Sequence, residues 1–226
     1  MKKNICIIPA RKNSKRIKNK NIKSFFGKPI IYYAIKTAIK SKLFQKIVVS
    51  TDSLKIKKIS EKFGATAPFL RDKRLSNDFT STKEVLIDAI NKLNIKDDFN
   101  LFCIYPTAAL IDENDLKKAY KKFKNLNADS LLAITTYDHP PQRALKIKGK
   151  SLSPENKRLF QKRTQDLKTL HHDSGTFSIF KIKFLKKKNY IFSKKTTYYK
   201  LSSLKGIDID VFENFKLAEY IKKSIN

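Results

Sequence analysis

The alternation of short β-rich runs with amphipathic helical patterns is the sequence feature that most constrains how this chain folds. This order is typical of βα units on a mainly parallel sheet. We therefore predict a Rossmann-like α/β fold in which helices flank the sheet. The strand-like runs cover residues 4–8, 47–50, 101–105 and 131–135, and the helical patterns cover residues 29–41, 53–63, 81–93 and 112–124.

Local signals indicate where these helices begin and end. Pro29 suits a first helical turn, and Gly64 can adopt the left-handed conformation that ends a helix. Ser81 and Glu84 have the spacing of a capping box, and Asp112 is a suitable N-cap. A chain of 226 residues is long enough for one to two domains, and we predict a single domain over residues 1–226.

The pattern becomes less regular after Ala144. β-like residues 144–147 lead through a turn at residues 149–150 into a polar stretch that ends at His171. We predict that residues 140–175 form a small insertion that acts as a flap or a dimerisation element. Further strands are predicted at residues 177–180 and 198–201, and a last helix at residues 212–225 with an apolar face of Phe212, Phe215, Ala218 and Ile221.

The balance of charge favours anionic partners. The chain has 50 Lys+Arg against 20 Asp+Glu, a formal net charge of +30, and such a field attracts phosphate-rich molecules whatever the fold. The lysines are spread over most of the chain, and no recognisable groove-reading or base-stacking module accompanies them. Solvated basic faces are therefore favoured over a nucleic-acid surface.

The sequence also bears on location. No apolar run approaches the roughly 18 residues that a membrane span needs, and Met1 leads into the first strand without a signal-peptide pattern. Cys6 and Cys103 lie in short apolar runs without metal-ligand spacing, which indicates buried free thiols in a reducing compartment. We expect a cytoplasmic protein with no membrane partner.

The loop after the first strand is the strongest candidate for a ligand site, because ligands of open α/β sheets lie beyond the carboxyl ends of the strands. Dispersed cations beside a helix start suit a triphosphate. Composition alone leaves a solvated basic loop equally open, and the Walker A pattern is absent from the sequence. The loop contains six basic side chains: Arg11, Lys12, Lys15, Arg16, Lys18 and Lys20.

Residues 206–210 form a second candidate element, with the sequence Gly-Ile-Asp-Ile-Asp. In an extended run, residues two apart share a face, so we predict that Asp208 and Asp210 project together while Ile207 and Ile209 point to the core. Two carboxylates on one face suit Mg²⁺, which takes one or two carboxylates plus phosphate oxygens and waters. A turn whose carboxylates pair with the abundant lysines is the alternative.

Short motifs follow one another along nearly the whole chain: IIPAR (7–11), SKRI (14–17), KN (20–21), GKP (27–29), VSTD (49–52), FGA (63–65), PFLR (68–71), LS with Asp78 (75–78) and YPTA (105–108). In this order they resemble the acylneuraminate cytidylyltransferases, which activate nine-carbon keto-sugar acids with CTP. Segments at residues 141–145, 154–155, 163–167 and 172–177 resemble the pseudaminic acid branch of that family.

The resemblance implies a fold of the nucleotide-diphospho-sugar transferase type, a Mg²⁺-dependent cytidylyltransferase and a homodimer built through the insertion. The implied catalytic residues are Arg11, Lys20 and Asp210, and the implied metal ligands are Asp208 and Asp210. The implied CTP contacts are Ala10, Arg11, Asn13, Ser14, Lys15, Arg16, Lys20, Asn21, Arg71 and Thr82. The implied sugar-acid contacts are Tyr105, Arg143, Gln165, His172 and Asp173.

Several alternatives stay open. The sugar acid can be legionaminic or N-acetylneuraminic acid, and a catalytically silent polyanion binder with the same fold is an alternative of another class. His172 can be a structural hydrogen-bonder, and zinc ligation by His171 and His172 lacks further ligands at a plausible spacing. Three departures from the family pattern bear on the site: residues 12–13 replace Gly-Gly, Lys18 replaces proline, and residues 108–110 replace Ala-Pro-Phe.

Overall fold

The computed structural model describes residues 3–187 and 191–225 of the chain. Its centre is a six-stranded sheet in the order β10-β6-β9-β5-β1-β4. Neighbouring strands are parallel except in the two pairs that contain β9. The predicted mainly parallel α/β sheet is therefore confirmed. The strands are β1 (Asn4–Pro9), β4 (Lys46–Ser50), β5 (Asn100–Ile104), β6 (Ser130–Thr136), β9 (His171–Lys181) and β10 (Thr196–Lys200).

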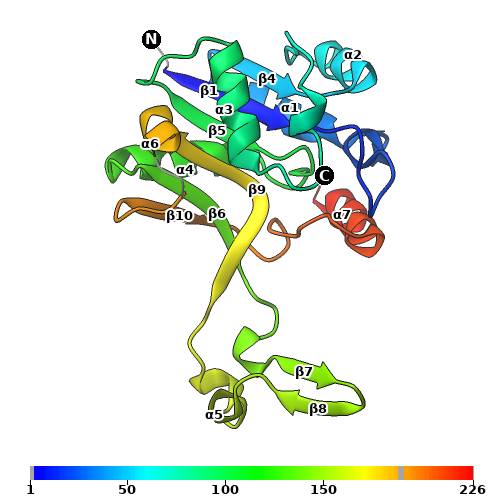
Figure 1. The fold of residues 1–226 in the computed structure, drawn as a ribbon, viewed down its shortest axis with the longest axis vertical. Coiled ribbons are helices and arrows are strands. Elements are labelled where there is room, and N and C mark those ends of the chain that lie inside the picture. Colours follow the sequence, from blue (N-terminus) through cyan, green and yellow to red (C-terminus); the bar gives the residue numbers. More distant parts are fainter. Residues whose placement is uncertain (1–2, 188–190, 226) are drawn as a thin grey trace.

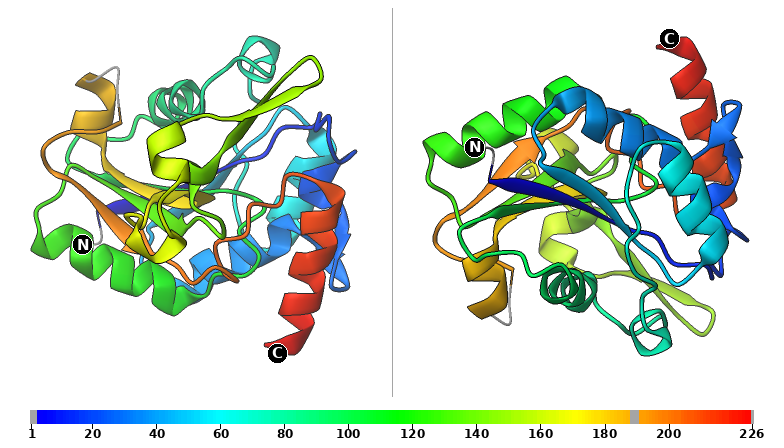
Figure 2. Two further views of the ribbon diagram at one scale, coloured as in Figure 1. Left: turned by 90° about the horizontal axis from the view of Figure 1, so that it is seen from below. Right: turned by 90° about the horizontal axis from the view of Figure 1, so that it is seen from above.

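Helices cover both faces of this sheet (Figures 1 and 2). In β1, Cys6 and Ile8 pack with α1, α2 and α4, while Ile5 and Ile7 pack with α3 and α6 on the opposite face. Alternate residues of a strand point to opposite faces, so a continuous apolar strand predicts this two-sided cover. The helices are α1 (Ile31–Ser41), α2 (Leu54–Lys62), α3 (Thr82–Lys92), α4 (Glu113–Asn125) and α6 (Ile182–Lys187).

The predicted N-terminal signals are confirmed at Ser81 and Asp112, whereas the one at Pro29 is wrong, because Pro29 lies in β3 (Lys28–Pro29) and α1 begins at Ile31. Ser53 accepts a hydrogen bond from the Ile56 N–H, and Ser81 and Asp112 each form a complete capping box. Each cap satisfies amide groups that the helix itself leaves without partners. The free cysteines Cys6 and Cys103 are buried in the core as predicted. Within residues 3–187 and 191–225, no helix is long and apolar enough to cross a membrane.

A third apolar cluster ties the loop after β1 to the end of the chain. Ile17 of that loop, Ile209 and Phe215 are buried together with Phe25 of the small hairpin formed by β2 (Ser24–Phe25) and β3 (Lys28–Pro29). Phe215 and Ala218 are the buried face of α7 (Phe212–Ser224). The two candidate site segments, residues 9–21 and 206–210, are thereby packed against one another.

The predicted apolar face of the last helix is wrong at one residue. Phe212 is 48% exposed, and the ammonium groups of Lys23 and Lys216 each lie 5.7 Å from the centroid of its ring. Phe212 is the first residue of α7, and this end of the helix lies at the surface. Helical periodicity therefore placed it on the buried face although the helix end lies at the surface.

An arm projects from the sheet between β6 and β9 (Figure 1). We define it as residues 137–170. It contains the 3₁₀ helices η3 (Pro141–Arg143) and η4 (Thr164–Asp166), the hairpin β7 (Leu145–Lys148) and β8 (Ser151–Pro154), and the short helix α5 (Lys157–Phe160). Residues 171–175, which the sequence placed in the insertion, belong to β9 and continue the main sheet. The predicted strand at residues 177–180 is accordingly the second part of a longer one.

Candidate active site

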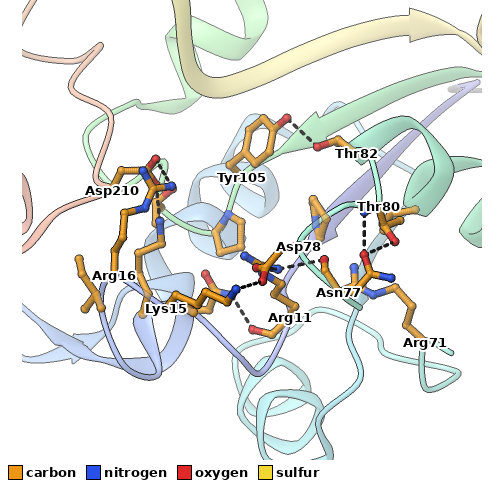
Figure 3. A pocket seen from close by; sticks show the side chains of 18 of the residues that line it. Arg11, Lys15, Arg16, Arg71, Asn77, Asp78, Thr80, Thr82, Tyr105 and Asp210 are labelled. Carbon is orange, nitrogen blue, oxygen red and sulfur yellow. Dashed lines mark hydrogen bonds and ion pairs between the residues drawn. The ribbon is translucent and has the colours of Figure 1, made fainter. Parts of the chain in front are cut away.

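A cavity of about 270 Å³ opens at the carboxyl ends of β1 and β5. Segments from residues 9–21, 71–85 and 105–107 surround it together with Asp210, and Figure 3 shows several of these side chains pointing toward one another. This is the edge at which ligands of parallel α/β sheets bind. The predicted site residues among its walls are Arg11, Ser14, Lys15, Arg16, Lys20, Asn21, Arg71, Thr82, Tyr105 and Asp210.

The backbone of the basic loop is held in place by hydrogen bonds. The Asn21 side-chain amide donates to the Arg11 carbonyl at 2.9 Å, and the Lys12 N–H donates to Asp52 Oδ1 at 2.7 Å. Left-handed backbone occurs in this loop at Asn19, with φ 55°, rather than at residues 12–13. The replacement of Gly-Gly at residues 12–13 therefore carries no backbone strain, since neither residue needs the conformation that favours glycine.

Four of the loop's six cations pair with two carboxylates. Arg11 Nη1 lies 2.7 Å from Asp78 Oδ1, and Lys15 Nζ lies 2.5 Å from Asp78 Oδ2. Hydrogen bonds from Lys15 and Arg11 lower the pKa of Asp78. Arg11 and Lys15 are thus in direct contact with an acid group at the cavity wall (Figure 3).

A second carboxylate, Asp210, faces the other two cations. Lys20 Nζ lies 2.7 Å from its Oδ1, and Arg16 Nη2 lies 2.6 Å from its Oδ2. Burial alone would raise the pKa of Asp210, but the Lys20 hydrogen bond and the charges of Lys20 and Arg16 lower it overall. The basic loop near the start of the chain and the acidic segment near its end are therefore in direct contact.

Asp208 has a different environment from Asp210. Partial burial, followed by the neighbouring Asp210 carboxylate, raises the pKa of Asp208, and Asp173 adds to the effect. Residues 206–210 are not the predicted extended strand, because the Asp210 N–H bonds back to the Asp208 carbonyl at 3.1 Å and closes a turn. Ile209 is buried as predicted, with 1% of its surface exposed.

The acidic segment fits a magnesium ion in the chemistry of its donors. Asp208 and Asp210 are hard oxygen ligands, and they are close enough for the Asp210 charge to contribute to the raised pKa of Asp208. Mg²⁺ is commonly bound by one or two carboxylates together with substrate phosphates. A cation between such groups would offset the repulsion that raises the pKa of Asp208.

The opposite end of the cavity is less charged and more buried. Arg71 is only 5% exposed, its Nε donates to Ser76 Oγ at 3.1 Å, and burial lowers its pKa. The Thr82 and Tyr105 hydroxyls lie 3.1 Å apart, and burial raises the pKa of Tyr105. This end offers hydrogen-bonding groups and apolar surface, as a nucleoside requires.

The residues predicted to contact the sugar acid do not converge in the same way. Arg143 and Gln165 lie on the arm, where the Arg143 guanidinium stacks 4.9 Å from the Phe160 ring centroid and donates to the Lys162 carbonyl at 3.1 Å. Neither residue lines the cavity.

His172 and Asp173 lie on β9, outside the cavity walls. The His172 ring packs 4.6 Å from that of Tyr137, and Asp173 accepts a hydrogen bond from the Gly175 N–H at 2.9 Å. Of the predicted CTP contacts, Ala10 is fully buried beneath the basic loop, and Asn13 is likewise not a wall residue.

Sequence reasoning missed the role of the segment before α3. Asn77, Asp78 and Thr80 line the cavity, and Asn77 Oδ1 accepts hydrogen bonds from the amides of Phe79 and Thr80 at 2.8 Å. The available signal was the position of Asp78 within a motif shared with the cytidylyltransferases. That motif did not identify Arg11 as the partner of Asp78, because the two residues are 67 positions apart in the sequence.

The fold and the site together define a nucleotide-binding α/β protein with the parts of a nucleotidyltransferase. The chain belongs to the cytidylyltransferase family, whose model matches residues 5–224.

Two curated relatives and one solved structure illustrate this membership. The chain is 37% identical to the pseudaminic acid cytidylyltransferase of Campylobacter jejuni, over 98% of this chain and 97% of that one. It is 28% identical to the CMP-N,N'-diacetyllegionaminic acid synthase of Legionella pneumophila, over 95% and 94%. Its fold is similar to that of CMP:2-keto-3-deoxy-manno-octonic acid synthetase complexed with CTP, with a TM-score of 0.73, 14% identity, and coverage of 99% and 100%.

Proposed function

We propose that the protein transfers CMP from CTP to the anomeric hydroxyl of pseudaminic acid and releases pyrophosphate. The hydroxyl oxygen attacks the α-phosphorus, the bond from that phosphorus to the bridging oxygen of the β-phosphate breaks, and the hydroxyl proton is lost. The observation that carries this proposal is the direct pairing of Arg16 and Lys20 of the basic loop with Asp210 at the wall of one cavity. A triphosphate has the charge and length to engage both.

The chain's own groups supply positioning and charge. We assign Arg11 and Lys20 to the triphosphate, with Lys15 and Arg16 as supporting cations. Preorganised cations of this kind stabilise charge that develops on phosphate oxygens, and their loss costs on the order of 3 kcal/mol in the barrier.

Ser14 and Asn21 are further triphosphate-side contacts in this proposal, since both line the cavity. Asn13 would contribute through its backbone amide, whereas the Ala10 N–H donates to the Ser50 carbonyl at 2.9 Å and Ala10 would act only by fixing the start of the loop. Arg71 and Thr82 are assigned to the cytosine and ribose end.

Magnesium belongs to the proposal as a group that Asp208 and Asp210 would hold. When bound, it would neutralise phosphate charge and favour departure of pyrophosphate.

The sugar acid is proposed from the relatives' names. The relative that is 37% identical is named for pseudaminic acid, whereas the one named for a legionaminic acid derivative is 28% identical. Arg143 and Gln165 are proposed to meet the sugar acid, with Arg143 suited to a bidentate contact with its carboxylate. His172, Asp173 and Tyr105 complete the proposed set.

A homodimer would reconcile these assignments with the position of the arm. One face of the β7–β8 hairpin carries Leu145, Ile147 and Leu152, which are 49%, 79% and 63% exposed. Apolar side chains so open to water favour a protein partner, and a second copy of this chain is the partner we propose. Arg143 and Gln165 would then act beside the cavity of the partner copy.

Turnover with defined sugar acids tests the proposed function. The purified protein should release pyrophosphate from CTP and Mg²⁺ with pseudaminic acid, more slowly with legionaminic or N-acetylneuraminic acid, and Asp210→Ala should abolish the reaction. Failure with every sugar acid would favour the alternative of a silent polyanion binder. That alternative predicts nucleic-acid binding that weakens steeply with salt and is indifferent to CTP.

A further inference from the structure

The acidic segment that approaches the basic loop contains no regular secondary structure. Asp208 and Asp210 stand between β10, which ends at Lys200, and α7, which begins at Phe212. A catalytic group must be held to within a fraction of an ångström for full effect. The structure shows how this irregular segment is fixed.

One side of the segment is packed directly against β6. A Cβ atom placed on Gly206 would lie 2.6 Å from Thr135 Cβ and 2.9 Å from both Thr135 Cγ2 and Oγ1. Real Cβ atoms essentially never approach so closely, and Thr135 Cβ cannot rotate away. Thr135 is itself 3% exposed. The backbone at residue 206 therefore reaches this position only without a side chain.

A second glycine, on the neighbouring strand β9, faces the Asp208 side chain. Gly175 lies in β9 where the register with β6 shifts between Leu132 and Ile134, and its φ is 62°. A Cβ on Gly175 would lie 3.2 Å from Asp208 Oδ1 and 3.3 Å from Asp208 Cγ. Bulges of this kind often re-aim strands beside active sites. Here the bulge leaves the space that the Asp208 carboxylate occupies.

Polar contacts hold the segment at its two ends. Lys205 Nζ donates to Asp112 Oδ2 at 2.6 Å and to Asp115 Oδ2 at 2.7 Å, and these carboxylates form the capping box of α4. At the other end, the Asn214 side-chain amide donates to the Asp208 carbonyl at 2.9 Å.

We propose that Gly175 and Gly206 are positioning residues of the cytidylyl transfer: the missing side chain at Gly206 lets the acidic segment pack on Thr135, and the missing side chain at Gly175 leaves a slot for the Asp208 carboxylate. This inference rests on the proposed function. The glycines do not touch the reacting groups, and they act by setting where Asp208 lies relative to Asp210. An added methyl group in the slot displaces the carboxylate and weakens metal binding with CTP.

The decisive comparison is Gly175→Ala against Gly149→Ala. The two glycines have nearly equal φ values, 62° and 60°, so an alanine brings a similar backbone cost at either position. A Cβ at Gly149 meets nothing within 4 Å, whereas a Cβ at Gly175 meets the Asp208 carboxylate. Mn²⁺ affinity in the presence of CTP, measured by electron paramagnetic resonance without sugar acid, reports on the slot independently of turnover.

The expected result is a Mn²⁺ dissociation constant at least tenfold higher in Gly175→Ala and unchanged in Gly149→Ala. With sugar acid present, kcat of Gly175→Ala should fall by a similar factor while KM for CTP changes less than threefold. Equal Mn²⁺ affinity in the two variants would overturn the proposal, even if both are less stable than the wild type.

A second-site rescue provides an independent test at Gly206. Gly206→Ala should weaken Mn²⁺ binding at least tenfold, and the double variant Gly206→Ala, Thr135→Gly should recover most of it, since Thr135→Gly removes all three of the atoms that the new Cβ meets most closely. Circular dichroism establishes that each variant is folded. If Gly206→Ala alone fails to fold, the Gly175 and Gly149 pair decides the question.

Failure of the inference is distinguishable from failure of the proposed function. A wild-type protein that turns over normally while Gly175→Ala and Gly206→Ala match it in Mn²⁺ affinity and kcat overturns the role of the slot alone. A wild-type protein that neither turns over nor binds Mn²⁺ with CTP overturns both.

Discussion

The cavity and the arm of this molecule are built in opposite ways. Around the cavity, segments distant in sequence are fixed by core packing: Ile17 and Ile209 belong to one buried cluster, and Arg71 is 5% exposed. On the arm, every residue of β7 is exposed, and the hairpin contacts solvent on both faces. The predicted CTP contacts largely converge in one chain, whereas Arg143 and Gln165 do not reach the cavity.

This difference indicates a division of labour. A triphosphate site needs rigid, converging charges, and the carboxyl edge of a packed sheet supplies them. The arm has exposed apolar side chains, and its Arg143 and Gln165 lie outside the cavity walls, as expected of a surface completed by another molecule. The following predictions test that contrast.

The largest expected effect is the loss of a cation from the cavity. Lys20→Gln should lower kcat/KM for CTP about a hundredfold, because Lys20 is the least exposed of the cations paired with Asp210 and faces the proposed phosphate position. Steady-state pyrophosphate release measures it. The matched change on the arm, Lys148→Gln, removes the same charge from an exposed strand and should leave KM for CTP unchanged. If kcat/KM for CTP falls equally in Lys20→Gln and Lys148→Gln, the proposal that the cavity and not the arm binds the triphosphate is wrong.

A smaller effect is expected when the arm is made more polar. Ile147→Lys should convert a dimer to monomers in sedimentation velocity and raise KM for the sugar acid about tenfold, with KM for CTP within about twofold. Ile147 is 79% exposed on the apolar face of the hairpin. Ser151→Lys adds the same charge to the opposite face, since Ser151 pairs with Lys148, and should leave the dimer intact. A wild-type monomer with full activity would contradict the proposed use of the arm.

The sequence predicted the cavity side well because its signals are local. Capping boxes at Ser81 and Asp112 act within four residues, and the rule that ligands bind at strand ends pointed to the basic loop without any knowledge of its partners. The two-carboxylate segment was also found, although its extended conformation was wrong. The packing of Gly206 against Thr135 of a distant strand is a further feature that no periodicity reports.

The remaining features depend on distant pairings. Polar residues 171–174 have the composition of a loop, yet they form the first part of β9 because β6 offers them backbone partners. Asp78 acquires its role only through Arg11 and Lys15, far away in sequence. Composition and periodicity describe a segment, but neither identifies its partner in space.

A further prediction concerns Asp78, which forms ion pairs with two cations at the cavity wall. Its carboxylate competes with a triphosphate for Arg11 and Lys15, so Asp78→Asn should bind CTP about threefold more tightly in isothermal titration calorimetry. Asp97→Asn makes the same change in net charge at a surface pair with Lys186 and should leave CTP affinity unaltered. Weaker CTP binding in Asp78→Asn would instead make Asp78 a support that holds Arg11 in place.

The smallest expected effect is a pH dependence of stability that arises beneath the acidic segment. Burial and the Asp115 carboxylate raise the pKa of Tyr199 to about 12, and the Tyr199 hydroxyl donates to Asp115 Oδ1 at 3.1 Å. Burial would lower the pKa of Lys205, but its hydrogen bonds to Asp112 and Asp115 raise it overall.

Both groups hold their protons more tightly in the folded protein than in the unfolded chain, in which tyrosine has a pKa of about 10. Their contribution to stability is therefore fully present below about pH 10 and is lost as the pH rises toward about 12. Melting temperatures from pH 9 to pH 12 should fall more gently in Tyr199→Phe than in the wild type, since the variant has no phenol to ionise. Parallel slopes would show that this network does not set the alkaline stability of the cavity side. If the melting temperature of Tyr199→Phe falls less steeply with pH than that of the wild type, and the variant remains a dimer, the effect of Tyr199 ionisation is confined to the cavity side of the molecule.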